Sequence, residues 1–198
     1  MKIRIQFGRV VALLLCVIFL FPLLVLVHEL GHVFATLWFG NSIDTITILG
    51  VEFYPHSLMA IYVGMGDYFG YVSYGGKVVL SRFDNGVVGM AGSGATLLLG
   101  VIAFGLLGVR KKFSFCITTL LLIISFSYLD MVSYTFGIRP GLRFGKAHEP
   151  LEAALQLGIP KTVWLVAMVI VFAVCTGFVV RYMKRTKYFQ NFYETSRH

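Results

Sequence analysis

Charged residues are scarce in this sequence. Asp, Glu, Lys and Arg make up 13% of its 198 residues, whereas 58% are hydrophobic and the mean hydropathy is +0.82. A soluble domain averages about 25% charged and 45–50% apolar residues. The deficit excludes a disordered chain and an ordinary soluble enzyme. It indicates a protein whose main solvent is lipid, and we expect a mainly α-helical membrane protein.

Cysteines are also few, and polar linkers, internal repeats and low-complexity segments are lacking. The three cysteines, Cys16, Cys116 and Cys175, each lie within an apolar run, which argues against a disulfide framework. We therefore interpret residues 1–198 as a single polytopic membrane domain. The net charge of +8 could suggest nucleic acid, but the basic residues adjoin the apolar runs, as in membrane flanks. The expected partner is the lipid bilayer and not nucleic acid.

Four apolar runs are long enough to cross a bilayer, for which a helix needs about 20 residues. They predict transmembrane helices at about residues 10–39, 86–109, 113–138 and 162–182. A cleaved signal peptide has a shorter apolar core, followed by a cleavage site of small residues. The first run is too long for that, and no convincing cleavage site follows it.

The distribution of Lys and Arg predicts the orientation of the four spans. Most basic residues lie before the first run, between the second and third runs, and after the fourth run. These segments share one side of a four-span chain, and cytoplasmic segments are enriched in Lys and Arg. We expect a multi-pass protein with both termini in the cytoplasm.

The segment at about residues 43–82 has a different pattern. Thr45 to Ile48 alternates with a period of two, β-prone stretches follow, and Gly and Pro punctuate them. We predict a small sheet or set of hairpins at the membrane surface, between the first and second helices. An irregular loop is the alternative interpretation.

The first apolar run contains the pentad His28-Glu29-Leu30-Gly31-His32. On a helix the two histidines lie one turn apart on the same face, so they can bind one Zn²⁺, and the Glu can act as a general base toward an activated water. A charged residue at the centre of a membrane helix costs on the order of 2.5–3.5 kcal/mol. This cost favours metal binding over hydrogen bonding to neighbouring helices or a position in the headgroup layer.

Asp130 is the best candidate for a third metal ligand, because it is the only acidic residue in the second to fourth runs. From Arg9 to His28 a helix rises about 28 Å, and from Lys112 to Asp130 it rises about 27 Å. The first and third spans run in the same direction, so the two sites fall at a similar height. Other assignments remain open.

His148 or Glu149 could supply the third ligand instead. We nevertheless interpret the His148–Glu149 pair as part of a solvated loop and His56 as a surface residue. Asp130 could alternatively pair with a backbone, Ser or Tyr group. The small-residue cluster Ala91–Ala95 is interpreted as a site of close helix packing, or of backbone contact with a bound chain.

These residues resemble the site-2 protease group of intramembrane zinc metalloproteases, in particular its short M50B-like branch. The pentad matches that family's zinc motif, including the Leu-Gly interior. The segment Met90–Thr96 is similar to the family's Ala-Gly-Pro segment, although Ser93 stands where Pro is usual. Leu129-Asp130 resembles its Leu-Asp-Gly motif, although Met131 stands where Gly is usual.

The resemblance implies an intramembrane zinc endopeptidase of a prokaryotic cell membrane that cleaves membrane-anchored proteins. Glu29 would be catalytic, and His28, His32 and Asp130 would bind Zn²⁺. Two alternatives remain: a membrane-embedded hydrolase of lipids or other amphiphiles, and a zinc-binding membrane protein without proteolytic activity. The sequence does not indicate an oligomeric state.

Overall fold

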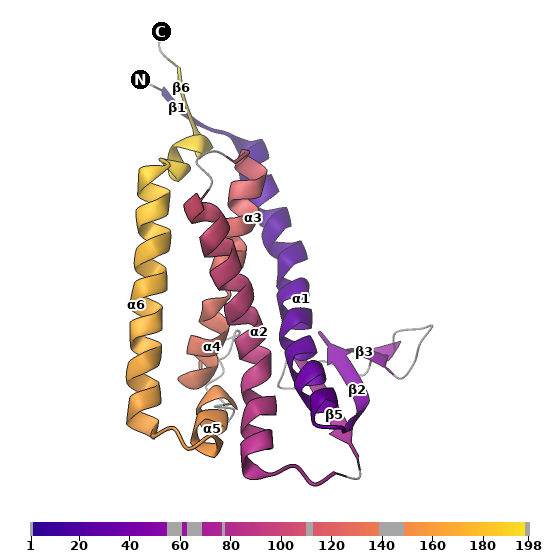
Figure 1. Ribbon diagram of the computed structural model, residues 1–198. Coiled ribbons are helices and arrows are strands. Elements are labelled where there is room, and N and C mark those ends of the chain that lie inside the picture. The colour runs from indigo at the N-terminus through magenta and orange to yellow at the C-terminus, as the bar shows by residue number, and fades with distance from the viewer. Residues whose placement is uncertain are drawn as a thin grey trace.

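The chain folds around long apolar helices, as expected from its composition. The structure is a computed structural model, and it describes residues 2–54, 61–62, 69–76, 78–109, 113–138 and 149–196. Within these residues, four helical segments are long and apolar enough to cross a membrane. They are α1 (Phe7–Trp38), α2 (Arg82–Val109), the segment Phe115–Thr135 and α6 (Lys161–Arg185) (Figure 1). The four predicted spans are thus confirmed as helices.

The third of these segments is not one continuous helix. It consists of α3 (Phe115–Ser125) and α4 (Tyr128–Thr135), with a two-residue break that the predicted helix at about 113–138 did not include. At the break the N–H groups of Phe126 and Ser127 donate to carbonyls three residues back, as in a 3₁₀ turn. The Ser127 hydroxyl donates to the Thr96 carbonyl at 2.7 Å, which ties the break to α2.

A four-stranded antiparallel sheet follows α1. It comprises β2 (Ser42–Ile48), β3 (Val51–Tyr54), β4 (Ile61–Tyr62) and β5 (Gly70–Gly75), in the order β4-β3-β2-β5. Leu49 and Gly50 both have positive φ angles, 51° and 77°, which suits the two-residue turn between β2 and β3. The predicted small sheet is confirmed, and β5 lies beside the second half of α1 (Figure 1).

The two ends of the described chain lie together, at the end of the helices remote from the sheet (Figure 1). There β1 (Lys2–Ile5) pairs antiparallel with β6 (Tyr193–Ser196), which follows the 3₁₀ helix η1 (Tyr188–Phe192). No local pattern in the sequence predicts this pairing. An apolar core fills the same end, with members from α2, α3, α6 and η1: Ala103, Leu107, Leu121, Leu122, Val179, Tyr188 and Phe192.

Helices α1 and α2 approach each other most closely at two glycines. A Cβ atom on Gly31 would overlap the Ala91 carbonyl of α2, and one on Gly92 would overlap the imidazole nitrogens of His28 and His32. Only glycine fits these positions without displacing backbone or a pentad side chain. The close packing predicted for the cluster Ala91–Ala95 is confirmed.

We predict that Gly31→Ala lowers the free energy of unfolding by about 1–3 kcal/mol, because the added methyl group must push two backbones apart. Gly94→Ala is the matched control, since a Cβ at Gly94 has nothing within 4 Å. It should raise that free energy by about 0.8–1.0 kcal/mol through helix propensity. Denaturant titration in detergent micelles, followed by circular dichroism, measures both. Equal stability of the two variants would contradict the close packing.

Candidate metal centre

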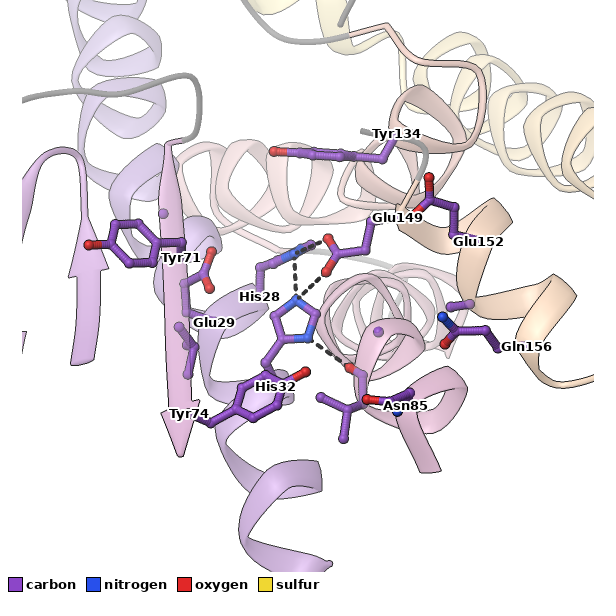
Figure 2. A pocket seen from close by; sticks show the side chains of 15 residues that line it. His28, Glu29, His32, Tyr71, Tyr74, Asn85, Tyr134, Glu149, Glu152 and Gln156 are labelled. Carbon is purple, nitrogen blue, oxygen red and sulfur yellow. Dashed lines mark hydrogen bonds and ion pairs between the residues drawn. The ribbon is translucent and has the colours of Figure 1, made fainter. Parts of the chain in front are cut away.

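The two pentad histidines converge on one point where α1 faces α2 and α5 (Figure 2). His28 and His32 are 7% and 8% exposed, and they lie one turn apart on one face of α1, as predicted. Their Nε2 atoms are 3.1 Å apart. This is a hydrogen-bond distance, at which one ring nitrogen donates to the other, and it is also short enough for both nitrogens to contact one small cation.

Glu149 completes this group. It begins α5 (Glu149–Gln156), and its Oε1 lies 3.4 Å from the Nε2 of His32 while its Oε2 lies 3.7 Å from the Nε2 of His28. Ligand atoms about 2.0–2.1 Å from a tetrahedral ion are about 3.3 Å from one another, so the spacing fits a single cation. Two imidazoles from α1 and one carboxylate from α5 could therefore hold a metal ion.

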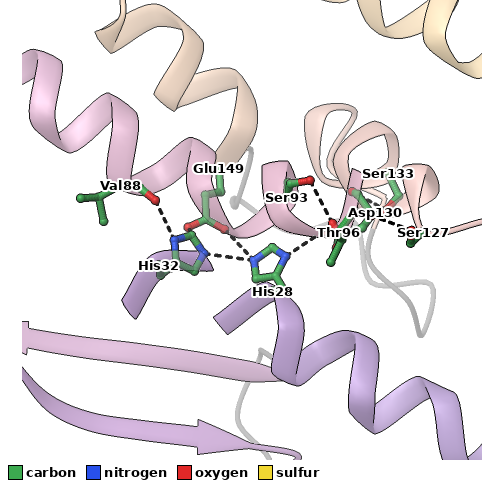
Figure 3. A network of polar contacts seen from close by, with 9 residues as sticks. All are labelled: His28, His32, Val88, Ser93, Thr96, Ser127, Asp130, Ser133 and Glu149. Carbon is green, nitrogen blue, oxygen red and sulfur yellow. Dashed lines mark hydrogen bonds and ion pairs between the residues drawn. The ribbon is translucent and has the colours of Figure 1, made fainter. Parts of the chain in front are cut away.

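Asp130 reaches the same site from the opposite side of the His28 ring (Figure 3). The Nδ1–H of His28 donates to its Oδ2 at 2.7 Å, and the Thr96 hydroxyl donates to the same oxygen at 2.7 Å. The prediction that His28 and Asp130 lie at a similar height along the helix axes is confirmed. However, the ligand atoms of His28, His32 and Glu149 all lie within 4.8 Å of one another, and Asp130 is not a member of this group. Its contact is that of a carboxylate that orients a metal-binding imidazole.

Both histidines are thus held by their Nδ1 atoms, and their Nε2 atoms face each other and Glu149. In His32 the Nδ1–H donates to the Val88 carbonyl of α2 at 2.8 Å. A hydrogen bond at one ring nitrogen fixes the tautomer and the orientation of the other. The two Nδ1 hydrogen bonds therefore fix the orientation of both rings.

The position of Glu149 corrects the interpretation of this segment as a solvated loop. Burial raises the pKa of the Glu149 carboxyl, but its contacts with His28 and His32 outweigh burial and hold the pKa below its usual value. An amphipathic pattern, with Leu151, Ala153 and Ala154 buried, was the signal for a helix here. His148 and His56 lie outside the described residues.

Glu29 points away from the metal group, toward the sheet (Figure 2). It is 4% exposed, and a Cβ on Gly70 of β5 would meet its Oε1, so strand and carboxylate are in close contact. Glu29 is therefore a buried carboxylate beside the two histidines in sequence but outside the ligand group.

Two cavities of opposite character meet at the site, and both are lined by His28, Glu29, Gly70 and Tyr134. The first, of about 470 Å³, is lined mainly by polar side chains and by β5, among them Tyr71, Tyr74, Asn85, Glu149, Glu152 and Gln156. The second, of about 340 Å³, is mostly apolar and lies along α1, α3 and α4, with walls that include Val17, Phe21, Leu24, Val25, Ile123, Phe126 and Leu129.

No family model matches the chain, and no curated protein or solved structure matches it either. The resemblance to site-2 proteases therefore depends on the motifs alone, and the site is interpreted from its own geometry.

We predict distinct effects of the three acidic residues around the histidines on Zn²⁺ affinity. Glu149→Ala should weaken binding by more than about 100-fold because it removes a direct contact, and Asp130→Ala by about 10–100-fold because it only orients His28. Glu152→Ala, one turn further along α5 in the same cavity, should change affinity by less than about twofold. Titration of the purified protein with Zn²⁺ against a competing chelator measures all three. If Glu149→Ala kept its Zn²⁺ affinity and Asp130→Ala lost it, Asp130 would be the ligand in place of Glu149.

Proposed function

We propose that this chain is a membrane-embedded zinc endopeptidase that hydrolyses peptide bonds of membrane-anchored proteins within or near the bilayer. The observation that carries the proposal is the meeting of a polar and an apolar cavity at His28 and Glu29. A bond cleaved at this junction has water on one side and an apolar environment on the other. A protein segment at the edge of a membrane meets both conditions.

The donor set fits Zn²⁺, because catalytic zinc takes three protein ligands from His and carboxylate groups and keeps one open position. We assign His28, His32 and Glu149 as ligands, and Asp130 as the residue that orients His28. When bound, Zn²⁺ would polarise the scissile carbonyl and activate the attacking water. Glu29 accepts the proton of that water and then delivers it to the leaving amine.

Strand β5 favours a peptide over a lipid as the substrate. Among the described strands it pairs only with β2, so its other edge is available to hydrogen-bond an extended segment. Gly70, Tyr71, Val72 and Tyr74 of β5 line the polar cavity beside Glu29. A helical substrate must unwind before its carbonyls can be attacked, and strand addition would hold the unwound form.

A bilayer location is supported by the apolar surfaces of the helices. α1 presents Ile18, Phe19 and Phe34 with more than half of their surface exposed, and α6 does the same with Val169 and Ile170. Such faces are stable in hydrocarbon. If the termini are cytoplasmic, the metal centre lies nearer the opposite membrane face, since it is close to the sheet end of α1 (Figure 1).

We predict that Glu29→Gln reduces cleavage by at least about 100-fold while zinc stays bound, because only the general base is lost. Glu152→Gln, which alters a carboxylate in the same cavity, should retain activity within about twofold. The assay uses purified protein in liposomes with doubly labelled single-span peptides, and phenanthroline should abolish cleavage. Full activity of Glu29→Gln would refute the mechanism. Hydrolysis of phospholipid but of no peptide would favour the lipid hydrolase.

We also predict that Leu24→Trp, which fills the apolar cavity, lowers cleavage of single-span peptides by about tenfold or more with zinc content unchanged. Leu23→Trp is the control, because Leu23 is the adjacent residue, is 48% exposed and does not line the cavity. It should change the rate by less than about twofold. Similar rates for both variants would exclude the apolar cavity from substrate binding.

A further inference from the structure

A third cavity, of about 230 Å³, lies at the opposite end of the molecule from the metal centre. It is formed where the last turn of α2 faces the last two turns of α6 (Figure 1). Its lining residues are Leu107, Gly108, Phe178, Arg181, Tyr182, Arg185 and Thr186.

Two arginines dominate the chemistry of this cavity. Arg181 and Arg185 are one helical turn apart, so both guanidinium groups project from the same face of α6. Like charges at this spacing repel each other. Among the side chains that the structure describes, no carboxylate lies within 4.0 Å of either one. With respect to those described side chains, the pair carries positive charge toward the cavity without a carboxylate partner.

The floor of the cavity is apolar. Leu107 is 3% exposed, and Phe178 packs edge-on against Phe104 with ring centroids 5.0 Å apart. On the α2 side a Cβ at Gly108 would have no neighbour within 4 Å, which leaves room beside the helix. The ligand that fits must combine an anionic group with an apolar body.

The position of the cavity along the helix axes also indicates a ligand with an anionic group and an apolar body. It lies where α2 ends at Val109 and where the apolar part of α6 gives way to Arg181, the level expected for lipid headgroups. Below it, Val101 and Val174 are 52% and 65% exposed, so the surfaces of α2 and α6 can accept acyl chains. Basic pockets between membrane helices at this level are suited to acidic lipid headgroups.

We propose that this cavity binds the phosphate of an anionic phospholipid. Arg181 and Arg185 donate hydrogen bonds to its phosphate oxygens, for which the planar guanidinium is well shaped. Leu107 and Phe178 contact the glycerol and the first methylene groups. A free phosphate ion shares the headgroup chemistry but makes no use of the apolar floor. The site depends on membrane insertion and is independent of hydrolysis at Glu29.

Native mass spectrometry of the purified full chain tests the proposal, with phosphatidylglycerol, phosphatidylcholine and inorganic phosphate as probes. We expect retention of phosphatidylglycerol over phosphatidylcholine, and a weakening of about tenfold or more in the double variant Arg181→Gln and Arg185→Gln. The matched control, Lys161→Gln and Lys184→Gln, removes two charges of α6 that do not line the cavity. It should weaken binding by less than about twofold.

A steric variant separates the cavity from general charge. Gly108→Leu fills the cavity without changing any charge and should weaken phosphatidylglycerol binding as the arginine variant does. Melting temperatures establish that each variant is folded. The proposal would be overturned if the arginine and lysine double variants lost phosphatidylglycerol binding equally. Unchanged phosphatidylglycerol binding in Gly108→Leu would overturn it as well. Displacement of phosphatidylglycerol by an equal concentration of inorganic phosphate would identify a free anion as the ligand and overturn the assignment to lipid.

Discussion

The contact between α1 and α2 is the constraint on which the rest of the structure depends. Gly31 lets the backbone of α1 meet the Ala91 carbonyl, and Gly92 leaves the space that the two imidazoles occupy. The same contact brings His32 to the Val88 carbonyl, which fixes its tautomer. Without two glycines facing one another, the histidines could not turn inward together.

Ionisable groups inside an apolar helix bundle are tolerated only when they satisfy one another. Here they form a continuous chain of contacts. Thr96 donates to Asp130, Asp130 accepts from His28, and Glu149 lies between the two histidines (Figure 3). A divalent cation would neutralise the carboxylate between the rings. The cluster could therefore hold a metal ion as well as satisfy its own hydrogen bonds.

The molecule separates its functions along the helix axes. The apolar core and the terminal strands occupy one end, together with the arginine-lined cavity. The metal centre, the sheet and α5 occupy the other (Figure 1). Packing at one end can thus hold the four helices while the polar cavity stays open at the other.

Much of this arrangement could be predicted from the sequence because the signals were local. The apolar runs predicted the four helices, and the period-two alternation predicted the sheet. The pentad predicted that both histidines lie on one face of a helix. Helical rise alone placed Asp130 level with His28. Glu149 was not assigned to the site, because its position depends on how α5 packs against α2 and α4, a long-range contact without a local pattern. The break at Ser127 likewise depends on a hydrogen bond to another helix, and the pairing of β1 with β6 joins opposite ends of the chain.

X-ray absorption at the zinc edge tests the central claim most directly, with cysteine placed at each candidate ligand position. A thiolate ligand adds a Zn–S distance of about 2.3 Å to the nitrogen and oxygen distances of about 2.0–2.2 Å. The account predicts one zinc per chain with two imidazole ligands, and a Zn–S distance in Glu149→Cys but not in Asp130→Cys. A spectrum without imidazole ligands, or sulfur bound only in Asp130→Cys, would contradict it.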